Sequence, residues 1–128
     1  MARVLVADDD LFYRNLVSGW LQVLGHEVVA VTNGDDALRT WRQAENPFHC
    51  LILDVYMAGL SGLELLGKIR RIAEVESDTW RPPPIIIMTS DERIQTEVAA
   101  RSRKAFSFLI KPFSEEEFRD AVSRALQQ

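Results

Sequence analysis

Polar side chains that can bind a cation or a phosphoryl group directly follow four apolar runs in this sequence, and three carboxylates stand among them without a gap. In chain order these residues are Asp8, Asp9, Asp10, Asp54, Thr89, Ser90 and Lys111. If the apolar runs are parallel strands, their carboxyl ends meet at one edge of a sheet, where ligands bind in open α/β folds. The joint placement of these side chains therefore predicts a functional site at that edge.

Carboxylates that gather at a partly buried edge repel one another. Two like charges about 4 Å apart cost about 1 kcal/mol in water and about 4 kcal/mol at an effective dielectric constant of 20. One acid must therefore stay protonated, or a cation must lie among the acids. Lys111 offsets only one charge. All-oxygen ligands without a nearby histidine or cysteine favour Mg²⁺ (or Mn²⁺) over zinc, so we expect a divalent cation as cofactor.

Each of these residues also has a purely structural explanation. Asp10 is most simply the N-cap of the helix that follows it. Asp54 could form a turn before Gly59 and Gly62, and Lys111 with the proline after it could be no more than a turn. Asp8 is harder to explain in this way, as is its neighbour Asp9, because one cap needs only one acid.

Five apolar runs are the elements that must position these side chains. The runs are continuous rather than alternating, which is typical of parallel strands covered by helices on both faces. They lie at 4–7, 28–31, 51–53, 85–88 and 108–110.

Helical spacing of apolar residues occurs between these runs and after the last one. The first expected helix ends at Gly25, the second spans 35–45 with Asn33 as its N-cap, and the third begins at about Gly62. The fourth, over 93–102, has a weak apolar pattern, and the fifth is capped by Ser114. In the weak helix, we expect Ile94, Val98 and Ala99 to face inward. The alternation predicts a three-layer α/β sandwich built from five β-α repeats.

Size and charge favour a single domain over residues 1–128. The chain is 47% hydrophobic and 27% charged, and its net charge of −4 argues against nucleic-acid binding through a general basic surface. No apolar run approaches the roughly 18 residues that cross a bilayer, and the start of the chain lacks a secretory signal. We therefore expect a cytoplasmic protein without membrane contact. Its one cysteine, Cys50, excludes an internal disulfide.

The chain resembles the receiver domain of two-component response regulators, through the segments VLVADDD, LILDVYMAGLSGLELL, IIIMTS and FLIKPF. The resemblance covers essentially the whole chain. It implies a (βα)5 flavodoxin-like fold with a parallel sheet in the strand order 2-1-3-4-5. It also implies that the chain receives a phosphoryl group from a histidine kinase or a histidine phosphotransfer domain, with the help of Mg²⁺.

The resemblance assigns the acceptor and its metal site by position. Asp54 matches the phospho-accepting aspartate, Asp9 the direct metal ligand and Asp8 the neighbouring acid of that site. The backbone carbonyl of Tyr56 would complete the protein ligands.

Three further residues match positions that respond to the phosphoryl group. Thr89 matches the hydroxyl that hydrogen-bonds it, Lys111 the lysine that pairs with it, and Phe108 the aromatic switch residue. Movement of Thr89 and Phe108 would bias the face formed by the last two helices and the strand between them. That face would bind a downstream effector, an output domain or a second copy of the chain.

Two features of the sequence leave questions open. Tyr56 and Asp91 occupy positions that tune phosphoryl lifetime in this family, and the residues themselves do not give the direction. The segment VESDTWRPPP, residues 75–84, resembles an insertion, and Trp80 within it could contact a partner or fold back on the preceding helix.

Other functions fit these residues less well than a phosphorylated switch. The alternative is a receiver-like interaction module that works without phosphorylation, which would have no need to keep repelling acids. A metal-dependent phosphatase typically has a second acid where this chain has Tyr56, and the acidic loop after the first strand would repel the phosphate of a flavin. We expect no enzyme beyond an acceptor that assists its own phosphorylation and dephosphorylation. The chain could be a stand-alone regulator or part of a longer protein.

Overall fold

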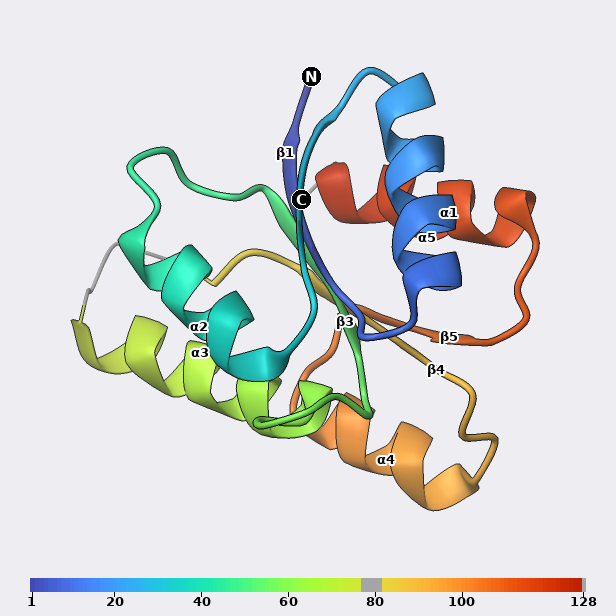
Figure 1. Ribbon diagram of the computed structural model, residues 1–128. Helices are drawn as coiled ribbons and strands as arrows, with labels where there is room; N and C mark the ends of the chain where they lie inside the picture. Colours follow the sequence, from blue (N-terminus) through green and yellow to red (C-terminus); the bar gives the residue numbers. More distant parts are fainter. Residues whose placement is uncertain (77–81, 128) are drawn as a thin grey trace.

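A single parallel sheet runs through the centre of the molecule (Figure 1). The computed structural model describes residues 1–76 and 82–127. Its strands are β1 Arg3–Ala7, β2 Glu27–Val31, β3 Cys50–Asp54, β4 Ile85–Thr89 and β5 Ser107–Ile110. They are ordered β2-β1-β3-β4-β5, and every neighbouring pair is parallel. The predicted flavodoxin-like strand order is confirmed.

The central strands are buried on both faces, as their continuous apolar runs predict. Every residue of β3 and β4 is buried, and both strands run one residue further than predicted, so that Asp54 and Thr89 are their last residues. The prediction is wrong for the two edge strands, where Ala30 of β2 and Ile110 of β5 are exposed. Each of these strands has a neighbour on one side only, so helices cannot cover it as fully.

Five helices alternate with the strands along the described parts of the chain. They are α1 Leu11–Val23, α2 Gly34–Gln43, α3 Gly62–Glu76, α4 Ile94–Ser102 and α5 Glu115–Leu126. The predicted caps are confirmed: Asp10 accepts from the backbone of Phe12, Asn33 caps α2, and Ser114 forms a capping box with Glu117. α2 ends two residues earlier than predicted.

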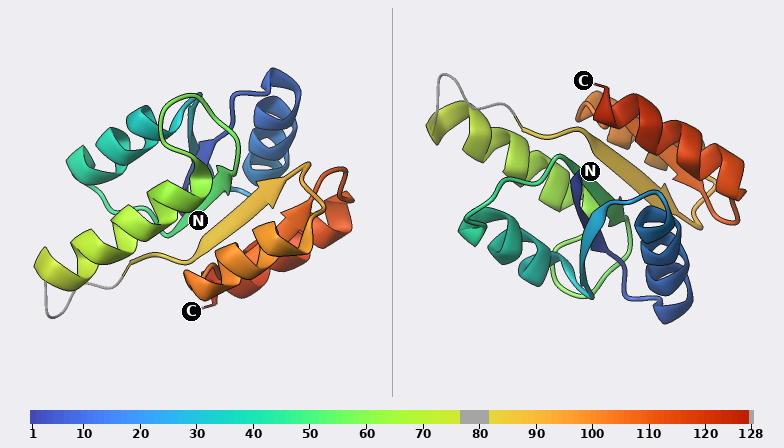
Figure 2. Two further views of the ribbon diagram at one scale, coloured as in Figure 1. Left: turned by 90° about the horizontal axis from the view of Figure 1, so that it is seen from below. Right: turned by 90° about the horizontal axis from the view of Figure 1, so that it is seen from above.

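The helices form two outer layers on either side of the sheet. α1 and α5 pack on one face, where Val4 and Val6 of β1 point, whereas α2 and α3 pack on the face of Leu5 and Ala7 (Figures 1 and 2). Figure 2 also shows α2 and α3 side by side. This alternation leaves the carboxyl ends of the strands free to carry polar side chains.

The inward face predicted for α4 is wrong. Ile94 is 78% exposed and Val98 59% exposed, while Thr96 and Ala100 are buried. The apolar residues have the expected helical period, but the helix is rotated so that a small residue and a hydrogen-bonded threonine face inward. Trp80 lies outside the described residues. None of the helices in the described parts of the chain is long and apolar enough to span a membrane.

Candidate functional site

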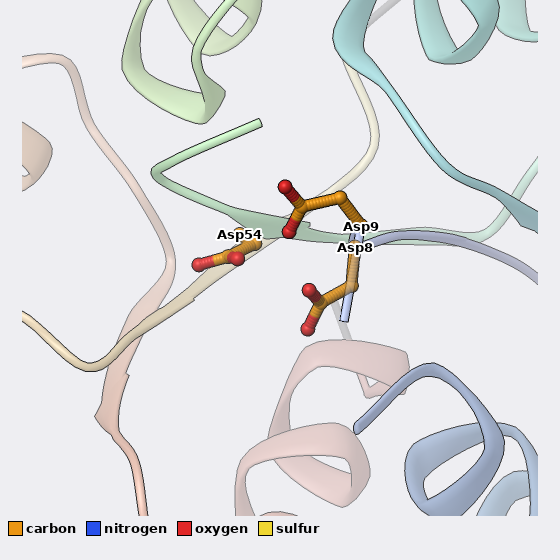
Figure 3. Close-up of side chains that lie close together, drawn as sticks. All are labelled: Asp8, Asp9 and Asp54. Carbon is orange, nitrogen blue, oxygen red and sulfur yellow. The ribbon is translucent and has the colours of Figure 1, made fainter. Parts of the chain in front are cut away.

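Five side chains selected from the sequence come together at the carboxyl edge of the sheet. Asp54 ends β3 and Thr89 ends β4. Asp8 and Asp9 follow β1, which lies beside β3, and Lys111 follows β5 beside β4. The predicted convergence of these residues therefore occurs, and Figure 3 shows the three carboxylates gathered where β1 and β3 end.

The three aspartates have the geometry of a divalent cation site. One carboxylate oxygen each of Asp8, Asp9 and Asp54 lies within 4.8 Å of the other two. Oxygens on opposite sides of a Mg²⁺ ion lie about 4.2 Å apart, so small side-chain rotations would bring all three to ligand distance. Asp8 and Asp54 are buried and Asp9 is exposed, which leaves one side open to water. A set of carboxylates with open positions suits Mg²⁺ or Mn²⁺.

The ammonium group of Lys111 is the positive charge of this site. Its Nζ lies 2.8 Å from Oδ2 of Asp8 and 3.5 Å from Oδ2 of Asp54, and the side chain is only 8% exposed. Burial opposes the charge, but the hydrogen bond to Asp8 and the neighbouring acids raise the pKa of Lys111 above its ordinary value. The other oxygen of Asp8 accepts from the backbone N–H of Asp10 at 2.9 Å. Lys111 is thus held charged beside the candidate acceptor.

The pKa of Asp54 reflects the crowding of charges. Burial and the charge of Asp8 raise it from 3.8 to about 7, although Lys111 acts in the opposite direction. In the absence of a metal, the cluster therefore relieves its repulsion by holding a proton near neutral pH. A divalent cation among the carboxylates would favour the ionised form of Asp54 instead.

A glycine lets α3 begin directly against the backbone of Asp54. The backbone N–H of Gly62 donates to the carbonyl of Val55 at 2.9 Å. A Cβ at Gly62 would collide with the backbone carbonyl of Asp54. The loop after Asp54 thus closes in a way that only glycine permits, which fixes the end of β3 relative to α3.

A hydrogen-bonded cluster joins the loop after β3 to the loop after β4 and the first turn of α4. The carboxylate of Asp91 accepts from the Tyr56 hydroxyl at 2.6 Å, from the Thr96 hydroxyl at 2.7 Å and from the Arg93 guanidinium at 2.7 Å. These bonds lower the pKa of Asp91. The Asp91 backbone N–H also donates to the Thr89 hydroxyl oxygen at 3.1 Å. We call Tyr56, Asp91, Arg93 and Thr96 the loop clasp.

Two members of the loop clasp, Arg93 and Thr96, were not predicted from the sequence. No local pattern marks them, because the Tyr56 hydroxyl meets Asp91 across 35 residues of sequence. Phe108, the predicted switch residue, is half-buried on β5 and lies opposite Ile87 of β4.

Comparison with protein families and curated relatives gives a consistent result. The response regulator receiver domain family matches residues 4–123. The DNA-binding transcriptional regulator NtrC of Azospirillum brasilense is 38% identical over 127 residues, which cover 98% of this chain and 24% of that protein. The response regulator protein FleR of Pseudomonas aeruginosa is 35% identical over 123 residues, covering 96% of this chain and 24% of that protein. The chain thus spans about a quarter of the length of these relatives.

Solved structures share the fold over nearly the full chain. The chemotaxis response regulator CheY4 of Vibrio cholerae aligns with a TM-score of 0.83 and 29% identity, over 98% of this chain and 99% of that one. The BeF3-activated receiver domain of DrrB aligns with a TM-score of 0.84 and 26% identity, over 100% and 99% of the two chains.

Proposed function

Because this chain belongs to the response regulator receiver domain family, we propose that Asp54 is the residue that accepts the phosphoryl group in two-component signalling. The observation that carries the assignment is the position of Asp54. It is a buried carboxylate with the Lys111 ammonium 3.5 Å away and the acids of Asp8 and Asp9 within reach of one shared cation. Phosphoryl transfer depends mainly on positioning and charge neutralisation, and this arrangement can supply both.

The chemistry follows from these neighbours. An oxygen of ionised Asp54 forms a bond to phosphorus while the bond from phosphorus to the donor's imidazole nitrogen breaks, and the imidazole leaves with that electron pair. Lys111 then pairs with a phosphoryl oxygen, and the Thr89 hydroxyl donates a hydrogen bond to another. When bound by Asp8, Asp9, Asp54 and the backbone carbonyl of Tyr56, Mg²⁺ or Mn²⁺ supplies further charge neutralisation. We also propose that the same groups assist hydrolysis of the acyl phosphate.

The phosphoryl signal would reach partners through α4, β5 and α5. Movement of the Thr89 hydroxyl toward the phosphoryl group would change the space next to Phe108, the proposed switch residue. Three apolar side chains are exposed on α4 and β5: Ile94, Val98 and Ile110, at 78%, 59% and 37%. We propose that this face contacts a downstream effector, an output domain or a second copy of the chain. The incoming donor would be a histidine kinase or a histidine phosphotransfer domain.

The relatives suggest what kind of output the signal controls. NtrC and ZraR are named as transcriptional regulators, and both are much longer than this chain. We propose that the chain acts as the receiver part of a signalling pathway whose output lies outside residues 1–128. Its cytoplasmic location stays a prediction.

The assignment of Asp54 is tested by incubation with Mg²⁺ and acetyl phosphate, followed by measurement of intact mass. We expect one phosphoryl group on the wild type and none on Asp54→Asn. Asp10→Asn is the matched control: it also removes one acid next to the cluster, but asparagine caps a helix as well as aspartate does, so labelling should persist.

Two results would contradict the proposal. Wild-type protein that stays unlabelled while a known receiver domain is labelled in the same solution would favour the phosphorylation-independent module. Labelling that survives in Asp54→Asn would place the acceptor elsewhere.

A further inference from the structure

The aromatic ring of Tyr13 faces the ammonium group of Lys111. The Lys111 Nζ lies 4.4 Å from the ring centroid, within the range of a cation–π contact. Tyr13 belongs to the first turn of α1, whereas Lys111 follows β5, so folding brings the two together from opposite ends of the chain. Tyr13 was not selected by the sequence analysis, because nothing local marks a tyrosine as the neighbour of a distant lysine.

Among the described residues, three groups lie in direct contact with the Lys111 ammonium, and the more distant Asp10 adds a weaker attraction. One is the Asp8 carboxylate at 2.8 Å, the second is the Asp54 carboxylate at 3.5 Å, and the third is the Tyr13 ring. The two carboxylates are also proposed metal ligands. A bound cation would draw on their negative charge and weaken their hold on the ammonium group, whereas the ring has no part in metal binding.

We propose that Tyr13 is a positioning residue for phosphoryl transfer, whose ring holds the Lys111 ammonium at the acceptor while the carboxylates turn to the cation. The ring attracts the ammonium group without a fixed hydrogen-bond direction, so Lys111 can turn toward an incoming phosphoryl oxygen. A third carboxylate in the same place would compete with the phosphoryl group for the ammonium. The proposal rests on the proposed role of Lys111.

Neighbouring rings fix the place of Tyr13. The Phe113 ring centroid lies 5.6 Å from that of Tyr13, and Phe12 meets it edge-on at 5.3 Å. Phe113 is buried and follows Lys111 by two residues. The contact between Tyr13 and Phe113 therefore ties α1 to the loop that carries the lysine, and the ring could serve packing alone. The experiment must separate packing from an effect on Lys111.

The test compares variants by their rate constants for phosphorylation with acetyl phosphate at saturating Mg²⁺, so that weaker metal binding cannot account for a loss. We expect Tyr13→Leu to be about 3- to 10-fold slower, the loss typical of one partly desolvated cation–π contact. Tyr13→Phe keeps the ring face and should stay within about two-fold of the wild type.

Trp20→Leu is the packing control. Trp20 also lies on α1 and contacts Phe113, at a centroid distance of 6.3 Å, but no contact joins it to Lys111 among the described residues. It should lower the melting temperature without slowing phosphorylation by more than about two-fold. Tyr13→Met, with a flexible side chain that fills gaps, replaces Tyr13→Leu if the leucine variant does not fold.

The outcomes separate this proposal from the assignment of Asp54. If the wild type is not phosphorylated, the proposed function fails first. If the wild type is phosphorylated, the proposal is overturned by a Tyr13→Leu rate equal to the wild type, by an equal loss in Tyr13→Phe, or by an equal loss in Trp20→Leu. Slowing confined to the leucine or methionine variant supports it.

Discussion

Replacing Asp54 with asparagine should stabilise the metal-free protein. Folding raises the pKa of Asp54 from 3.8 to about 7, a change of about three pKa units, and each unit corresponds to about 1.4 kcal/mol. The ionised carboxylate thus costs up to about 4 kcal/mol at a pH well above 7. Asparagine removes that cost, which is already a net value because the pKa of about 7 includes the favourable contact with Lys111 at 3.5 Å, but its amide still has to be buried. We therefore expect a net gain of about 1–3 kcal/mol in the free energy of unfolding.

The gain should depend on pH in a defined direction. Below about pH 4, Asp54 is protonated in both the folded and the unfolded protein, so its titration contributes no difference between wild type and variant. Between about pH 4 and 7, the unfolded chain loses this proton while the folded protein keeps it, so the wild type loses stability as the pH rises. Above about pH 7 both states are ionised, and the difference between variant and wild type reaches its full value.

Urea unfolding in the presence of a chelator measures this difference. We would compare the wild type, Asp54→Asn and the control Asp10→Asn at about pH 4, 5.5 and 7.5. Added Mg²⁺ should then raise the stability of the wild type more than that of Asp54→Asn, because only the wild type keeps all three carboxylates. The reasoning is refuted if the advantage of Asp54→Asn over the wild type is the same at all three pH values.

Three further predictions use other parts of the structure. Gly62→Ala should destabilise the protein by about 1–3 kcal/mol and slow phosphorylation, because the new Cβ would collide with the backbone carbonyl of Asp54. The control Gly67→Ala lies in the same helix and has open space around its Cβ, so it should stabilise the protein by about 0.5–1 kcal/mol. Thermal melting distinguishes the two variants. Asp91→Ala should speed amide hydrogen exchange in the first turn of α4 but not in α5, because it removes the centre of the loop clasp; unchanged exchange in α4 would contradict this. Ile94→Asp and Val98→Asp should change the free energy of unfolding by less than about 0.5 kcal/mol, because both side chains are exposed. Each should weaken any phosphorylation-dependent dimer in analytical ultracentrifugation. A dimer as stable as that of the wild type would exclude this face as the dimer interface.

The sheet could be predicted because its signal is local and redundant. A continuous apolar run such as 85–88 is typical of a strand covered on both faces, and five such runs at regular intervals leave few topologies. The order of the strands came from the family resemblance rather than from the runs themselves. The exposure of Ala30 on β2 could not be predicted from its apolar run, which does not say that this strand lies at the edge; only the strand order implied by the resemblance did.

The candidate site could be predicted in part for a similar reason. Residues at the ends of parallel strands must meet, so the positions of Asp8, Asp54 and Lys111 followed from topology. The contact of Tyr13 with Lys111 depends on how α1 is rotated against the sheet. Such contacts are fixed by tertiary packing, and the spacing of residues along one segment carries no information about them.

The wrong prediction for α4 has a consequence for how the protein can work. Ile94 and Val98 satisfy a helical period, but period alone does not determine which face of a helix turns inward. The inner face of α4 instead offers Ala100, which buries little apolar area, and Thr96, whose hydroxyl is bonded to Asp91. α4 is therefore held in part by polar contacts with the loop after β4, beside the packing of Ala100 in the apolar core. Because the backbone of that loop also bonds the Thr89 hydroxyl, a shift of Thr89 toward a phosphoryl group would disturb the same contacts that hold α4. The few apolar contacts of this helix and its exposed apolar side chains are both consistent with the proposed switch, in which phosphorylation of Asp54 would move this surface.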